Sequence, residues 1–86
     1  MSVTKSIINE QNKIWLETGT MPNRCSVGVG VIKMLMLEYL LGEDGISFSD
    51  SFAFGKVGNM RLTKCYRLKP EQIIVHKLMD FDWGKL

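Results

Sequence analysis

The stretch from Val27 to Gly42 constrains the fold most, because its apolar residues cover nearly every side of the helix that they predict. We expect this helix to run from about Val31 to Leu41, with Lys33 and Glu38 as its main polar residues. A helix that is apolar all round is either central to a fold or half of a subunit interface. A chain of 86 residues buries only about 60–65% of its unfolded surface. We therefore expect this helix to contact a second copy of the chain or another protein.

Length and composition indicate one globular domain, residues 1–86. Hydrophobic residues make up 45% of the chain, and the net charge is only +2, which argues against disorder. The run Val31 to Leu41 contains two charges and is too short to cross a bilayer, and the polar N-terminus does not resemble a secretory signal. We expect a soluble cytoplasmic protein with no membrane partner.

A first helix is predicted for residues 3–18, where apolar residues recur with the helical period. Ser2 or Thr4 can cap its start, and Gly19 is suited to the left-handed conformation that ends a helix. We expect its buried face to consist of Val3, Ile7, Ile8, Ile14, Trp15 and Thr18.

Four other segments predict extended backbone. They are a short strand from Arg24 to Val27 or Val29, a strand or β-like loop from Ile46 to Phe54, an alternating strand from Met60 to Leu68, and a last strand from Gln72 to His76. Lys64 falls on the apolar side of the alternating strand, which predicts a bulge or an edge there. The order of elements predicts an α+β fold, a small mostly antiparallel sheet with two helices packed on one face.

Gly28 and Gly30 lie between a predicted strand and a predicted helix, as in a dinucleotide-binding turn. In such a turn the glycines admit a pyrophosphate against the helix N-terminus. The third glycine of the fingerprint would fall at position 33, where this chain has Lys33, and no second βαβ half follows. We therefore expect a steric role for the glycines, with phosphate binding helped by Lys33 as the alternative, and no cofactor.

Residues suited to catalysis or metal binding are few. Cys25, Cys65 and His76 lack the close pairing of a structural zinc site, and neither cysteine lies in a recognisable catalytic signature. We expect buried thiols, a hydrogen-bonded structural histidine and no enzymatic activity. A small Cys/His enzyme is the alternative, and it requires an exposed thiol close to His76.

Basic residues are concentrated in the second half of the chain. Residues 51–86 carry seven Lys or Arg against three Asp or Glu, whereas residues 1–50 carry four against six. A run without acids contains Lys56, Arg61, Lys64, Arg67 and Lys69. Such a run is either a solvated face or a site for a phosphate, another anion or an acidic partner.

If the apolar residues of the strand 60–68 face the core, Arg61 and Arg67 project together from its other face. Arginine suits phosphates and carboxylates equally well. This face has no aromatic residue of its own on which a base could stack, so nucleotide or nucleic-acid binding is the second choice. The candidate binding residues are the five of the basic run together with Lys33.

The C-terminal segment ends in the sequence Met-Asp-Phe-Asp-Trp-Gly-Lys-Leu. It either folds back to cap the sheet or docks onto a neighbouring subunit, where a basic strand would complement its acids. We expect a homo-oligomer, and the candidate interface residues are Leu37, Leu41, Phe81 and Trp83.

The order of motifs resembles that of small, uncharacterised tailed-phage accessory proteins. The resemblance covers roughly residues 20–76 and includes part of the arrangement of the phage major capsid fold. Its residues are Pro22-Asn23 before a strand, Leu35 within the next helix, Gly58-Asn59-Met60-Arg61-Leu62, and Ile73-Ile74-Val75. The resemblance implies a viral protein in the host cytoplasm that works by binding. Its task would be to inhibit a host factor, sequester a small ligand or join a virion assembly.

Overall fold

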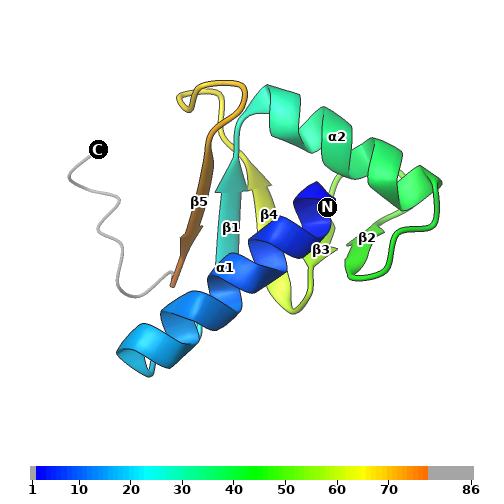
Figure 1. The fold of residues 1–86 in the computed structure, drawn as a ribbon. Helices are drawn as coiled ribbons and strands as arrows, with labels where there is room; N and C mark the ends of the chain where they lie inside the picture. Colours follow the sequence, from blue (N-terminus) through cyan, green and yellow to red (C-terminus); the bar gives the residue numbers. More distant parts are fainter. Residues whose placement is uncertain (1, 78–86) are drawn as a thin grey trace.

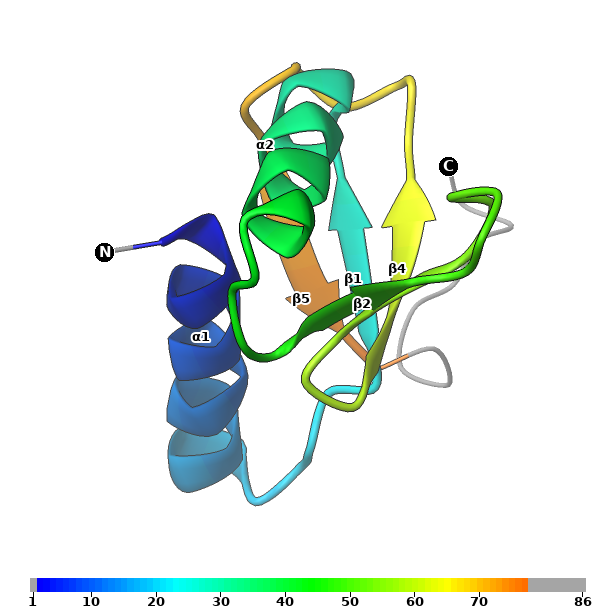
Figure 2. The same ribbon diagram turned by 90° about the vertical axis from the view of Figure 1, so that its right-hand side faces the viewer.

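The computed structural model describes residues 2–77, which form two helices and one five-stranded sheet. The elements are α1 (Val3–Thr18), β1 (Arg24–Val27), α2 (Val29–Leu40), β2 (Ile46–Phe48), β3 (Gly55–Val57), β4 (Met60–Lys64) and β5 (Ile73–His76). Both helices lie on the same side of the sheet and leave its other face without helical cover (Figures 1 and 2). The predicted α+β class is confirmed. No helix within residues 2–77 is long and apolar enough to span a membrane.

The strands are arranged in the order β2-β3-β4-β1-β5. The one parallel pair is β1 with β4, and the other three neighbouring pairs are antiparallel. The chain leaves β1, forms α2 over the sheet, and returns through the β2–β3 hairpin to place β4 beside β1 (Figure 1). This crossover brings residues near position 24 next to residues near position 61, which are far apart in the sequence.

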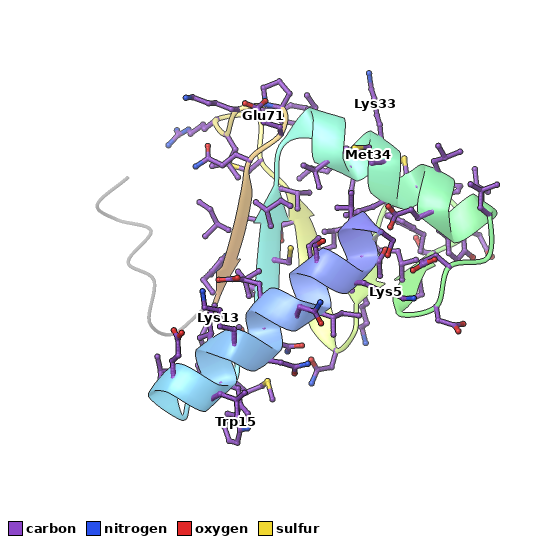
Figure 3. The ribbon with its side chains drawn as sticks, in the orientation of Figure 1. Lys5, Lys13, Trp15, Lys33, Met34 and Glu71 are labelled. Carbon is purple, nitrogen blue, oxygen red and sulfur yellow. The ribbon has the colours of Figure 1, made fainter. Side chains whose placement is uncertain are left out.

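Helix α1 has the predicted bounds, with the Ser2 side chain accepting a hydrogen bond from the Lys5 amide and Gly19 in the left-handed conformation. Its buried residues are Thr4, Ile7 and Gln11. The predicted burial of Trp15 and Thr18 is wrong: Trp15 is 45% exposed and Thr18 is also exposed, because α1 extends beyond the sheet at this end (Figure 3).

Helix α2 begins at Val29, two residues before the predicted start, and Val31, Ile32 and Leu35 pack into the core. The glycines before and within its first turn have a steric role. A Cβ on Gly28 would collide with the carbonyl oxygen of Lys69, and one on Gly30 would lie 2.8 Å from the carbonyl oxygen of Pro70. Helix α1 adds Ile7 to this core, and the sheet contributes the remaining residues, which are Cys25, Val27, Ile46, Val57, Met60 and Leu62.

Two of the predicted strands are shorter than expected. The segment 46–54 forms only β2 before it turns, and β4 ends at Lys64 instead of Leu68. The Cys65 amide donates to the carbonyl of Val27, the last residue of β1, at 2.9 Å, and β1 then gives way to α2. Because β4 has no partner beyond this point, the chain turns. The predicted bulge at Lys64 is wrong, since β4 pairs with β1 in continuous register, but the alternative of an edge holds: β3 pairs with β4 only at residues 60–62, so Lys64 is paired with Val27 of β1 alone.

Candidate functional site

Four basic residues form a row across the helix-free face of the sheet. Residues alternate between the two faces of a strand, and Cys25, Leu62 and Val57 face the helices. Their neighbours therefore face the other way. In the register, Lys56 of β3 lies opposite Arg61 of β4, Arg61 opposite Arg24 of β1, and Arg24 opposite His76 of β5. We call Lys56, Arg61, Arg24 and His76 the basic row. It crosses three strand spacings, about 14 Å.

No acid offsets this charge on the strands, because none of the five described strands contains Asp or Glu. Like charges directly opposite each other in a sheet are destabilising, by roughly 0.2–1 kcal/mol a pair. Local features that cost stability are expected where function requires them. The basic row is therefore the strongest candidate site on the described part of the chain.

Arg24 is the member of the row that the sequence analysis missed. It lies in the first half of the chain, where acidic residues outnumber basic ones, so the distribution of charge along the sequence did not indicate a basic site at Arg24. The parallel register with β4 brings it beside Arg61. Its Nε atom is buried and has no hydrogen-bond partner within residues 2–77. The one local signal was the alternation of polar Arg24 and Ser26 with apolar Cys25 and Val27.

His76 ends the row as a polar but uncharged group. The Ser26 hydroxyl lies 2.9 Å from its Nε2 atom, so the predicted hydrogen-bonded histidine is confirmed. Burial lowers the pKa of His76, and the positive charge of Arg24 lowers it further, against a backbone hydrogen bond at Lys77 that raises it. The imidazole is neutral at pH 7, and the permanent charges are those of Lys56, Arg61 and Arg24.

An exposed aromatic ring lies beside the row, which corrects the expectation that this face offers none. The guanidinium carbon of Arg61 lies 5.6 Å from the ring centre of Phe54, and Phe54 is 61% exposed. An open hollow of about 480 Å³ adjoins both side chains. Its lining residues are Ser47, Phe48, Ser49, Phe54, Gly55, Lys56 and Arg61. Its size is suited to a small ligand or one base of a polymer.

The loop between β2 and β3 holds Phe54 in this position. The Ser49 hydroxyl accepts a hydrogen bond from the Phe54 amide at 3.1 Å, and the Ser49 amide donates to the Phe54 carbonyl at 2.9 Å. Phe52 has a φ of 58°, which is unusual for a residue other than glycine. Its ring packs against Tyr39 and Phe48 with centroids 6.0 and 5.3 Å away, and this packing anchors the turn.

The six predicted binding residues do not form one site. Lys56 and Arg61 belong to the basic row, whereas Lys64 ends β4, and Arg67 and Lys69 lie in the segment that turns over the start of α2. The prediction that Arg61 and Arg67 project together is wrong, because the strand ends before Arg67. Lys33 is exposed on α2 and points away from the sheet (Figure 3).

The start of α2, which was the alternative site for a phosphate, is occupied by another segment of the chain. The Val31 amide donates to the Pro70 carbonyl at 2.9 Å, and the Gly28 amide donates to the Gln72 carbonyl at 3.0 Å. These amides are the donors that a bound phosphate would need. The loop before β5 therefore takes the place of the anion.

The cysteines differ in their surroundings. Cys25 is fully buried, and burial raises the pKa of its thiol to about 12, which keeps it protonated and unreactive. Cys65 is half-buried, so the prediction of two buried thiols holds fully for Cys25 alone. Among residues 2–77 no three His, Cys, Asp or Glu side chains are grouped as metal ligands.

The predicted interface residues on α2 are exposed, Leu37 by 57% and Leu41 by 78%. Phe81 and Trp83 lie outside the described residues.

A comparison of the chain with protein-family models, with curated proteins and with solved structures gave no match. The tailed-phage resemblance therefore stays a prediction.

Proposed function

We propose that this chain is a non-catalytic binding protein whose helix-free sheet face binds a single-stranded nucleic acid. The observation that carries the proposal is the register that aligns Lys56, Arg61 and Arg24 on three neighbouring strands. Three permanent charges in a row, with no acid on the described strands, favour a ligand with several negative charges. Phosphates of a nucleic-acid backbone meet this requirement, and arginine binds them through two parallel hydrogen bonds.

Phe54 and the hollow beside it favour a single strand over a duplex. Unpaired bases stack on aromatic side chains, whereas the bases of a duplex are already stacked on one another. The ring of Phe54 is exposed beside Arg61 of the basic row, so one chain of nucleotides can place phosphates on the row and a base on the ring. Ser47 and Ser49 line the same hollow, and a serine hydroxyl can donate a hydrogen bond to a phosphate or a base.

The proposed binding role includes the tasks that the phage resemblance implies, namely inhibition of a host factor, sequestration of a ligand and virion assembly. An acidic protein segment is the competing ligand for the same row, because carboxylates also pair with arginine. The two ligands differ in their need for Phe54, since an acidic segment has no base to stack.

Fluorescence anisotropy with a labelled single-stranded oligonucleotide of about ten nucleotides tests the proposal. We expect binding that weakens steeply between about 50 and 200 mM salt, because phosphate contacts release counterions. Arg61→Gln should weaken binding, and the same change at Lys13 should not, since Lys13 is exposed on α1, which lies on the other side of the sheet (Figure 2). Absence of binding at the lowest salt concentration, or equal weakening by Lys13→Gln, would refute the proposal.

A further inference from the structure

The outer side of α2 carries an apolar stripe that no described element covers. It is formed by Met34, Leu37 and Leu40, at intervals of three residues on the helix, and by the capping residue Leu41, and these four side chains are exposed by 53 to 78%. The opposite side of the same helix packs into the core. Contiguous exposed patches of this kind mark interaction surfaces.

Charges at the two ends of the stripe are opposite in sign. Lys33 lies in the first half of α2 and is exposed, with its side chain directed outward (Figure 3). Asp44 is exposed just beyond the end of the helix, and Glu43 is half-buried next to it. The stripe between them is apolar, so the surface has a positive end, an apolar middle and a negative end.

We propose that this stripe binds the same stripe of a second copy, with the two α2 helices antiparallel and Leu37 at the centre. An antiparallel pair centred on Leu37 places position 33 of one copy beside position 41 of the other, three residues from Asp44. Lys33 then lies near Asp44 of the second copy, twice in each dimer. A parallel pair would instead set Lys33 against Lys33. Antiparallel helices also align each positive N-terminus with a negative C-terminus.

The size of the surface predicts a weak dimer. Helix α2 has 12 residues and is therefore about 18 Å long. One pair of such helices buries less area than a standard stable interface, and dimers of this class dissociate on dilution. The stripe and the basic row lie on opposite sides of the molecule, since α2 covers the other face of the sheet (Figure 2). The inference therefore does not rest on the nucleic-acid proposal.

Sedimentation velocity from micromolar to millimolar concentration tests the dimer. The native chain should rise from the monomer mass of 9.8 kDa toward twice that value. Leu37→Asp should weaken association about tenfold or more, because it places a charge at the centre of the interface. Leu16→Asp is the matched control, since Leu16 is 82% exposed on α1, and it should associate like the native chain.

The charges give a second test that does not alter the apolar stripe. Lys33→Glu and Asp44→Lys should each weaken association a few-fold, and the double variant should restore it because the pair is re-formed with the signs exchanged. Circular dichroism and thermal unfolding establish that each variant is folded. If the double variant is weaker than both single variants, the antiparallel arrangement is wrong.

A native chain that keeps the monomer mass at every concentration would overturn the proposal. So would equal weakening by Leu16→Asp and Leu37→Asp. The other occupant that an apolar helix face suits is a lipid surface. Flotation with vesicles of neutral phospholipid tests it, and binding to vesicles by a chain that remains monomeric would assign the stripe to a membrane surface instead.

Discussion

Lys56 and Arg61 lie directly opposite each other on β3 and β4, on the face of the sheet that neither helix covers. Neither side chain has an acidic partner within the described strands, and Arg24 continues the row on the next strand. The sheet gains no stability from this arrangement, which concentrates positive charge on one face.

The first prediction follows from the cost of that arrangement. Lys56→Thr removes one like-charge pair and introduces a residue favoured in strands, so the free energy of unfolding should rise by about 0.2–1 kcal/mol. The same change should weaken oligonucleotide binding. Urea unfolding and anisotropy measure the two effects. A variant that is both less stable and equally good at binding would show that the charge serves the fold.

The second prediction concerns the dependence of binding on salt. Each phosphate contact to a single strand contributes about −0.7 to the slope of log K against log salt concentration. Three contacts predict a slope of about −2, and Arg24→Gln should bring it to about −1.4. The slope should be unchanged in Lys13→Gln, which alters a charge on α1. A slope that is the same in native chain and Arg24→Gln would exclude Arg24 from the contact.

The third prediction separates base stacking from charge. Phe54→Ala should weaken binding by about 1–3 kcal/mol, the range for loss of one stacked base, without changing the salt slope. Phe54→Trp should preserve binding. Tyr66→Ala is the matched control, because Tyr66 is also an exposed aromatic residue but lies beyond the end of β4. If Phe54→Ala binds the oligonucleotide as tightly as the native chain, no base of the ligand stacks on this ring.

The fourth prediction concerns a contact that joins the two helices. The carboxylate of Glu38, on α2, accepts hydrogen bonds from the amides of Val3 and Thr4 and from the Thr4 hydroxyl, at 2.6 to 2.9 Å. Partial desolvation raises the pKa of Glu38, but the hydrogen bonds from Thr4 and Val3 outweigh it and leave the pKa below the ordinary value. The ionised carboxylate therefore stabilises the start of α1.

Because the folded-state pKa is the lower one, this stabilisation is complete above the unfolded pKa, about 4.3, and is lost as pH falls through the folded value. Glu38→Gln should cost about 1 kcal/mol at pH 7. The difference between native chain and variant should shrink as the pH falls below the ordinary carboxyl range. Urea unfolding at several pH values measures it. A difference that does not change with pH would show that the charge of Glu38 has no part in the contact.

Local sequence signals were sufficient for the bounds of α1 and for the presence of α2. The bounds of α1 follow from Ser2, Gly19 and the helical period between them, and Gly28 was expected to be required for steric reasons. The local pattern could not predict the strand order or the exposure of Trp15. Whether Trp15 is covered depends on how far α1 extends past the sheet, which its own residues do not encode.

The candidate site was only partly predictable for the same reason. Lys56 and Arg61 were identified from the basic run, but Arg67 was grouped with them because the strand was expected to continue past Lys64. Arg24 joins the row through a parallel pairing across 37 positions of sequence, from 24 to 61. Phe54 reaches it through the fold of the β2–β3 loop. Both contacts are products of tertiary structure.

Titration of isotope-labelled protein with a single-stranded oligonucleotide, followed by NMR amide shifts, tests the central claim most directly. The account predicts that the largest shifts fall on β1, β3, β4 and the loop that carries Phe54, with Arg24 and Arg61 among them. Shifts centred instead on Lys33, Arg67 and Lys69 would contradict it and would place the ligand at the start of α2.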